Sequence, residues 1–190
     1  TVLFDHHASP SFIKGSLATL RRAVEKVGLR SALCYETTDR NGFEGRDAGI
    51  AENRAFLAGG ASALTLGMVG GHASFTLSDE SLDLLAGAAR DGHSSLHVHL
   101  AEDRADVEDC RERTGSGLIA RLRSHGLLTP RAVLAHGVHL TRKEVAEVTA
   151  RLRAAMQADY VVLGGGNAKK LDGVAKGVEL GDNANAFIGG

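Results

Sequence analysis

The stretch SLHVHLAED, residues 95–103, places two histidines at alternate positions of an apolar run and follows them with a carboxylate. Side chains alternate between the two faces of a β-strand, so the apolar residues of this run point one way while His97 and His99 point the other. An imidazole on the inner face of a sheet can ligate a metal ion, and Glu102 can reach the same place if the chain turns after the strand. The stretch therefore predicts a strand whose carboxyl end carries chemistry.

Short apolar runs alternate with longer charged segments along the whole chain. The strand candidates are residues 2–7, 31–36, 63–73, 95–101, 132–140 and 160–165, and the helix candidates lie near residues 11–28, 47–58, 79–91, 103–125 and 141–157. This alternation predicts an α/β fold with a parallel sheet, either an open doubly wound sheet or part of a (β/α)₈ barrel. A complete barrel takes about 250 residues, more than the 190 of this chain.

The composition narrows the class of protein. The formal net charge is −1 and charged residues make up 24% of the chain, so nothing favours a nucleic-acid or membrane-surface partner. The longest apolar runs are far short of the roughly 18 residues that span a bilayer. Cys34 and Cys110 form no motif, which predicts reduced thiols and a cytoplasmic protein. The sequence leaves open whether the chain forms a homo-oligomer.

Polar side chains crowd the predicted strand ends, and seven of the nine histidines lie at or near them. The carboxyl ends of parallel strands meet at one rim, where the active sites of barrels and open α/β sheets lie. One histidine on such a strand is more often a hydrogen-bonded structural residue, but a set on consecutive strands favours a site. The strand-end residues are Asp5, His6, His7, Glu36, Asp39, His72, His97, His99, Glu102, His136 and His139.

Two segments carry a family resemblance. HVHLAED (residues 97–103) and LAHGVHLT (residues 134–141) resemble the amidohydrolase superfamily, in its aminohydrolase and chlorohydrolase branch. DHHASP, CYETTDRNG and GGHASFTLSDE resemble its SsnA-like aminohydrolases. The resemblance covers about residues 1–148. It implies that residues 1–150 are part of a metal-dependent hydrolase barrel, an incomplete (β/α)₈ TIM barrel holding about strands 2–6.

The resemblance also implies a role for each matching residue. The implied chemistry is hydrolysis of a C–N or C–Cl bond on a small nitrogen heterocycle by metal-activated water, with zinc or iron as the divalent metal. Carried over by position, His99 is the metal ligand, Glu102 the general acid and base, His136 the residue beside the metal toward the substrate, and His72 a substrate-facing residue. His6, His7, Glu36 and Asp39 would line the pocket, and His97 would fill an inner layer of the barrel.

Other residues of the family pattern have no counterpart here. The His-x-His pair of the family's first strand should precede Thr1, and the aspartate of its eighth strand should lie downstream, where the sequence changes character. His99 and His136 are then two candidate ligands, fewer than the three protein ligands of a catalytic zinc site. We expect this chain on its own to be inactive and to bind the catalytic metal poorly.

The C-terminal stretch resembles a different family. ADYVVLGGGNAKKL (residues 158–171) and GDNANAFIGG (residues 181–190) are similar to the end of ROK-family sugar kinases. This implies a foreign βα tail over residues 151–190, with Gly164, Gly165 and Gly166 near a nucleotide. The alternatives to a hydrolase fragment are a remnant of an ATP-dependent ROK-type kinase and a non-catalytic fusion product. The apolar residues 161–163 suit a sixth strand of the parallel sheet.

Overall fold

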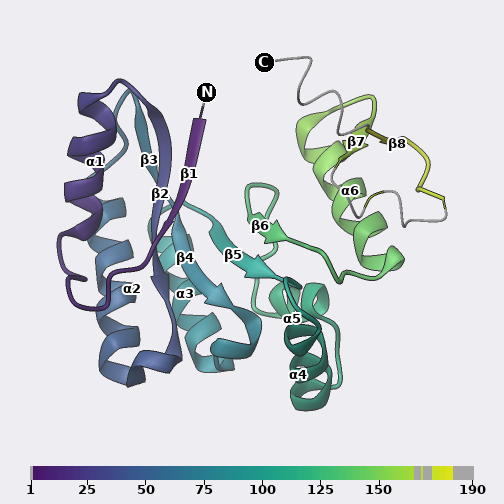
Figure 1. Ribbon diagram of the computed structural model, residues 1–190, viewed down its shortest axis with the longest axis horizontal. Helices are drawn as coiled ribbons and strands as arrows, with labels where there is room; N and C mark the ends of the chain where they lie inside the picture. Colours follow the sequence, from purple (N-terminus) through teal and green to yellow (C-terminus); the bar gives the residue numbers. More distant parts are fainter. Residues whose placement is uncertain (1, 165–167, 169–172, 182–190) are drawn as a thin grey trace. The chain divides into compact units, whose positions relative to one another are not determined.

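A computed structural model of the chain describes residues 2–164, 168 and 173–181 (Figure 1). The chain divides into two compact units, residues 1–137 and residues 138–190. Each unit is described by itself.

The first unit alternates strands and helices, and every strand pairing in it is parallel. Its strands are β1 (Val2–His7), β2 (Arg30–Thr37), β3 (Thr65–Gly67), β4 (Val69–Ala73), β5 (Leu96–Leu100) and β6 (Val133–His136). Its α-helices are α1 (Ser16–Lys26), α2 (Gly42–Ala58), α3 (Asp79–Asp91), α4 (Arg104–Thr114) and α5 (Leu118–Ser124). Two 3₁₀ turns, η1 (Asp39–Asn41) and η2 (Ser74–Thr76), follow β2 and β4.

The order of the strands settles the topology of this sheet. The strands lie in the order β1-β2-β4-β5-β6, and β3 pairs beside β2 (Figure 1). A doubly wound sheet reverses its strand order at a switch point, whereas barrel strands keep their chain order. The order found here has no reversal. The first unit therefore has the topology of part of a barrel. This confirms the predicted α/β fold with a parallel sheet and favours the partial barrel over the doubly wound sheet.

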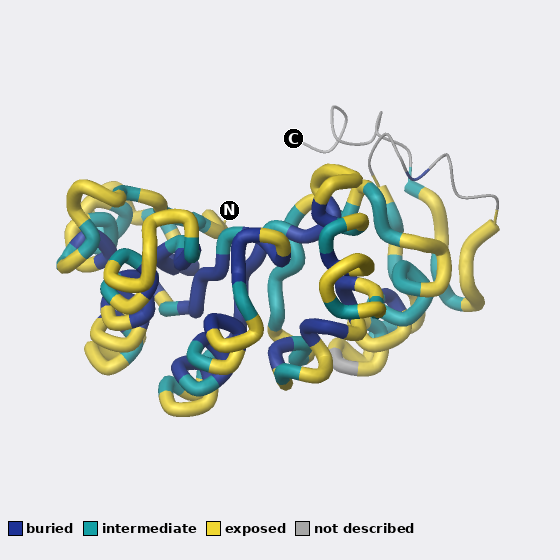
Figure 2. Tube along the Cα trace, turned by 90° about the horizontal axis from the view of Figure 1, so that it is seen from below, coloured by how far each residue is buried: buried dark blue, intermediate teal, exposed yellow. Residues whose placement is uncertain are grey.

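The two faces of the sheet have different neighbours. On the helix side, Leu33 and Tyr35 of β2 form one buried cluster with Leu17 of α1 and Phe56 of α2. On the opposite side, alternate residues of the same strand pack with β3–β4 and β6 instead, in a cluster of Ala32, Cys34, Met68 and Val133. Figure 2 shows the buried positions along the inner strands and the exposed positions on the outer turns of the helices. Strand alternation thus separates a helix-covered face from an inner face.

Helix α2 holds the ends of two neighbouring elements. The N-cap residue of helix α1 is Gly15, which has no side chain to cap the helix. The buried Glu52 of α2 supplies the cap, because its carboxylate accepts hydrogen bonds from the backbone N–H groups of Gly15 and Leu17 at 2.7 and 3.0 Å. The next residue, Asn53, pairs with both the N–H and the carbonyl of Tyr35 at 2.8 and 2.9 Å. These bonds satisfy buried backbone groups and fix α1 and α2 against β2.

Two elements expected from the sequence are broken in the structure. The single strand expected over residues 63–73 is β3 and β4, which meet at Met68, whose N–H donates to the carbonyl of Leu33 at 2.9 Å. The single helix expected over residues 103–125 is α4 and α5. Its break lies at Gly115, where φ is 68° and glycine is favoured. Strand β6 also ends earlier than expected, at His136.

The second unit consists of α6 (Arg142–Met156), β7 (Val161–Leu163) and β8 (Val178–Leu180). The capping box of Thr141 and Glu144 expected at the start of α6 is present. Strand β7 pairs in parallel with β8 and not with the main sheet, so the expected sixth strand is wrong. The reason is β8, which the sequence pattern did not indicate and which offers β7 a partner within the same unit.

The structure divides the chain into compact units between residues 137 and 138. The boundary near residue 150 between two family parts falls inside α6 and stays a prediction. Among the described residues, no helix combines the length and the apolar character that crossing a membrane requires.

A methyl group at Gly70 tests the pairing of β2 with β4. A Cβ there would lie 2.3 Å from the carbonyl oxygen of Tyr35, whereas a Cβ at Gly59 would meet nothing closer than 3.4 Å. We expect Gly70→Ala to lower the free energy of unfolding by about 1–3 kcal/mol or more, because overpacking at backbone forces the strands apart. Urea unfolding measures this loss, with Gly59→Ala as the matched control. Equal stability of the two variants would contradict the close approach of the strands.

Candidate active site

The carboxyl ends of the strands bring a cluster of imidazole rings together. The ring of His6 on β1 lies 4.3 Å from that of His99 and 4.6 Å from that of His97, both on β5. The rings of His72 on β4 and His136 on β6 lie 5.7 and 5.2 Å from that of His99. His99 is therefore in contact with histidines from three other strands, and the cluster covers most of the rim predicted from the sequence.

Two carboxylates border the cluster. The Glu36 Oε2 atom lies 3.8 Å from His6 Nε2, and the Glu102 Oε2 atom lies 3.6 Å from His136 Nε2. Glu102 reaches this position because the chain turns directly after β5, where Ala101 has φ 51°. The turn after the strand that Glu102 needs in order to reach the site is therefore present.

A buried aspartate holds that turn. Asp106, in the first turn of α4, accepts hydrogen bonds from the N–H of Ala101 at 2.9 Å and from the N–H of Phe75 at 3.0 Å. It is 2% exposed, and burial raises the pKa of its carboxyl while the two backbone bonds oppose that shift. Asp106 was not among the residues singled out from the sequence. Its only signal was an acidic residue in the first turn of a helix that follows a site strand.

His136 has an unusual backbone conformation. Its φ is 71°, a left-handed value that a side chain of this size rarely adopts. The following N–H, that of Gly137, donates to the carbonyl of Leu100 at 2.8 Å and holds the bend. Strained backbone of this kind is concentrated at functional sites. The bend turns His136 toward His99 and Glu102.

The other predicted residues are placed at the edge of the cluster. The Arg40 guanidinium lies 3.1 and 3.2 Å from the two ring nitrogens of His72, and Thr76 Oγ1 lies 2.9 Å from Nδ1 of the same ring. The Nε2 atom of His7 is 2.8 Å from the hydroxyl of Ser9. Asp39 is not brought to the cluster, because its carboxylate accepts from the Ser78 N–H and the Ser81 hydroxyl at the start of α3.

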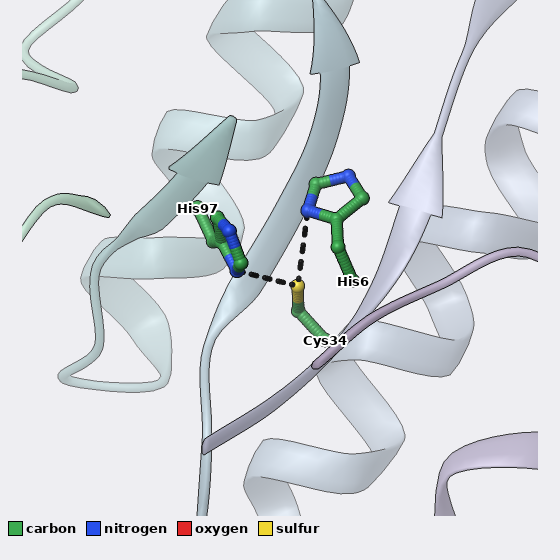
Figure 3. Close-up of side chains that lie close together, drawn as sticks. All are labelled: His6, Cys34 and His97. Atoms are coloured by element: carbon green, nitrogen blue, oxygen red, sulfur yellow. Dashed lines mark hydrogen bonds between the residues drawn. The ribbon is translucent and has the colours of Figure 1, made fainter. Parts of the chain in front are cut away.

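Cys34 is a member of the inner face that the sequence did not single out. It is fully buried, and its Sγ atom lies 3.6 Å from His6 Nδ1 and 3.7 Å from His97 Nδ1 (Figure 3). The only available signal was its place on the strand, two residues before Glu36 and so on the same face. The parallel register also sets Cys34 opposite His6.

Burial and mutual repulsion keep these histidines neutral. Desolvation, with the neighbouring imidazoles adding to it, lowers the pKa of His6 to about 3. Burial, with a smaller effect of His99, lowers the pKa of His97 to about 4. Burial, with a smaller effect of the Arg40 charge, lowers the pKa of His72 to about 4. The pKa of His99 is lowered by burial and by His136, against the opposite effect of Glu102. A neutral imidazole has the free lone pair that a metal ion needs.

The residues present fit a divalent cation. One ligand atom from each of His6, Glu36 and His99 lies within 4.8 Å of the others, a nitrogen and oxygen set that zinc and similar ions accept. Within the described part of the chain, the buried Nε2 atom of His6 has no hydrogen-bond partner. An unpaired buried polar atom is costly, and a cation would satisfy it.

The nucleotide-binding prediction falls mostly outside the described residues. Gly164 follows β7 directly, as a strand-then-glycine turn requires, and a Cβ there would meet nothing within 4 Å. Gly165 and Gly166 lie outside the residues that the structure describes.

Comparison with known proteins identifies the family. The sequence profile of the amidohydrolase family matches residues 1–188. The chain belongs to the amidohydrolase family. This match includes residues 151–188, so it does not separate an amidohydrolase part from the tail. The kinase-like origin of the tail stays a prediction.

Curated relatives include several deaminases. The chain is 36% identical over 126 residues to the 5-methylthioadenosine/S-adenosylhomocysteine deaminase of Moorella thermoacetica, covering 65% of this chain and 29% of that protein. It is 33% identical over 128 residues to the 5′-deoxyadenosine deaminase of Methanoregula boonei, covering 66% and 29%. A third deaminase, the 5-methylthioadenosine/S-adenosylhomocysteine deaminase 2 of Archaeoglobus fulgidus, is 30% identical over 161 residues, or 83% of this chain and 38% of that one. The chain therefore spans about a third of the length of these relatives.

Solved structures with a similar fold include deaminases and a triazine-degrading hydrolase. The triazine hydrolase of Arthrobacter aurescens gives a TM-score of 0.71 at 17% identity, covering 96% of this chain and 44% of that one. An adenosine deaminase of Xanthomonas campestris with bound zinc gives 0.67 at 19% identity, covering 79% and 33%. At these identities the likeness shows the fold, a sheet and helices arranged as in part of an amidohydrolase barrel.

The buried histidines predict how stability depends on pH. The folded pKa of His6 lies below its unfolded value near 6.5, so its contribution is fully present above pH 6.5 and is lost as pH falls toward 3. His6 alone then gives a slope of up to about 1.4 kcal/mol per pH unit in that range. We expect urea unfolding between pH 7 and 4 to show falling stability, with a smaller slope in His6→Gln.

The matched control for this prediction is His93→Asn. His93 lies outside the cluster and has φ 48°, which asparagine tolerates. This variant removes an imidazole without changing the cluster. A His6→Gln variant that lost stability as steeply as the control would show that His6 is not a neutral buried group.

Proposed function

We propose that this chain supplies one side of the active-site rim of a metal-dependent aminohydrolase or chlorohydrolase that acts on a small nitrogen heterocycle. The observation that carries the proposal is the position of Glu102, 3.6 Å from His136 and on the same strand end as His99. A carboxylate beside a metal-ligating histidine is the arrangement that metal-assisted hydrolysis uses. The deaminases and chlorohydrolases among the similar proteins support this choice of chemistry.

His99, with His6 and Glu36, would hold the divalent cation. When bound, the ion supplies the Lewis acidity that makes water a nucleophile near neutral pH. Zinc or iron suits this set of ligands, since imidazole nitrogen accepts both. Every other part of the reaction falls to side chains of the rim.

Glu102 would move the proton. Its carboxylate takes a proton from the attacking water as a new C–O bond forms at the heterocycle carbon. In a deamination the same proton passes to the leaving nitrogen as the C–N bond breaks, and in a dechlorination the C–Cl bond breaks and chloride leaves. His136 lies next to Glu102, where it can hydrogen-bond the atom that gains charge. His72, with His7 at the edge, would orient the ring.

Ligand binding by this chain tests the assignment of the site. With zinc present, we expect 5′-deoxyadenosine or a chlorinated triazine to bind, and His99→Ala or Glu102→Gln to weaken that binding at least about tenfold, because each loses a charged or metal contact. Isothermal titration calorimetry measures it, with Glu108→Gln on the exposed side of α4 as the matched control. Equal affinity in all variants would overturn the proposal.

Turnover is a separate expectation. We expect no release of ammonia or chloride by this chain alone, because the resemblance implies at most two ligands of the catalytic metal in it, His99 and His136, and a catalytic zinc site takes three. Ammonia and chloride assays with added zinc measure it. Turnover that disappears in Glu102→Gln would show that the chain is active and support the role of Glu102. Turnover that survives this substitution would contradict that role.

A nucleotide contact in the tail is a second candidate, supported by the strand-then-glycine sequence at β7 and Gly164. We expect saturable ATP binding that a substitution of Gly165 weakens, measured by fluorescence of a labelled nucleotide. Absence of saturable binding would end this candidate.

A further inference from the structure

The inner face of the sheet contains a buried group of soft and borderline ligands, of which the proposed hydrolase site uses only His6. The group consists of Cys34 on β2, His6 on β1 and His97 on β5, and we call it the thiol group. One ligand atom from each lies within 4.8 Å of the others. Figure 3 shows the sulfur of Cys34 between the two imidazole rings.

The distances in the thiol group match those around a tetrahedral ion. Zinc binds thiolate sulfur at about 2.3 Å and imidazole nitrogen at about 2.0–2.1 Å, which sets a sulfur and a nitrogen on one ion about 3.6 Å apart. The Cys34 Sγ atom lies 3.6 Å from His6 Nδ1 and 3.7 Å from His97 Nδ1. Both separations suit a hydrogen bond to sulfur, and both are also those of two ligands on the same ion.

The hydrogen-bond inventory of the thiol group is poorly satisfied. A thiol carries one weak donor, and here it faces the carbonyl of Asp5 at 3.4 Å as well as two ring nitrogens. One proton serves only one of these acceptors, and the alternative of a ring N–H bonded to sulfur uses a weak acceptor. A cation would accept lone pairs from all three side chains together. Cys34 is fully buried and His97 is 5% exposed, so water is a poor substitute.

Burial of His6 adds an independent observation. Its side chain is 7% exposed, and its second nitrogen, Nε2, is directed toward Glu36 at 3.8 Å without a hydrogen bond within the described part of the chain. The ring therefore lies between Cys34 and Glu36 with a single weak hydrogen bond, the one between Nδ1 and the sulfur. A buried imidazole with both nitrogens so placed is well prepared for a metal ion.

We propose that Cys34, His6 and His97 form a binding site for a thiophilic transition-metal ion of the zinc class, which shares His6 with the cation position at His99 and Glu36 but has two other ligands of its own. The thiolate selects zinc, cobalt(II) or copper(I) over magnesium or calcium. The ion ties β1 and β2 to β5 across the inner face of the sheet, so its role is to stabilise the first unit. The site does not depend on the proposed hydrolase activity.

Cobalt(II) is the probe for this site, because a thiolate bound to cobalt gives a charge-transfer absorption that imidazole and carboxylate ligands do not give. The chain has two cysteines, and Cys110 on α4 is bonded within its own segment, to Thr114 and Ser116. The Cys110→Ser chain therefore retains Cys34 as its one thiol. We expect this variant to show the absorption on titration with cobalt(II), and zinc to displace it.

Two variants then assign the other ligand and separate this site from the hydrolase site. In the Cys110→Ser chain, His97→Asn should weaken cobalt binding at least about tenfold, since even outer-shell losses cost that much. His99→Ala should leave the absorption in place, although it removes the cation ligand of the proposed hydrolase. Zinc should also raise the melting temperature of the Cys110→Ser chain and of the unmodified chain alike.

The outcomes decide the proposal. Absence of the charge-transfer absorption in the folded Cys110→Ser chain overturns it, whatever the behaviour of any Cys34 variant. An absorption lost in His99→Ala but kept in His97→Asn also overturns it, because the thiol would then belong to the hydrolase cation position. Circular dichroism of each variant confirms that the chain compared is folded.

Discussion

Unbroken parallel pairing from β1 to β6 is the constraint on which the rest of the first unit depends. Because every strand runs the same way and keeps its chain order, all the carboxyl ends meet at one rim. The register then sets His6 opposite Cys34, and Leu100 opposite His136. Side-chain alternation does the rest, since it sends His97 and His99 to the inner face together. The cluster of imidazoles is a consequence of this pairing and needs no long loop to assemble it.

A polar inner face of this kind is unfavourable by itself, and the other face offsets it. Burial disfavours the charged form of each histidine, and the unpaired nitrogen of His6 is a further cost. The helix side supplies apolar burial through Leu17, Leu33 and Phe56. Helix α2 adds the backbone bonds of Asn53, which fix β2, the strand that carries both Cys34 and Glu36. Residues on the helix-covered face of the sheet, which have no part in the chemistry of the site, therefore stabilise it.

Much of this arrangement could be predicted from the sequence, and the failures have particular causes. Alternation in HVHL predicts the inward side chains, and the turn at Ala101 that aims Glu102 was required by that prediction. Cys34 was missed because a thiol in the apolar run SALCYE has the pattern of a small core residue. Asp39 follows a site strand like its neighbours, but the start of α3 competes for its carboxylate. Strand β7 was assigned to the wrong sheet because sequence shows a strand without showing its partner.

His6 connects the two groups of ligands in the first unit and limits how they are used. Its Nδ1 atom faces Cys34, and its Nε2 atom faces Glu36. A neutral imidazole has one lone pair available for a metal and one N–H, so the nitrogen that binds an ion fixes the proton on the other. An ion held by Cys34 and His97 would leave His6 donating toward Glu36, with no lone pair for an ion beside His99. Only loss of the ring proton would allow both. The tautomer of this one buried side chain therefore couples the thiol group to the hydrolase position, although the two groups share no other ligand.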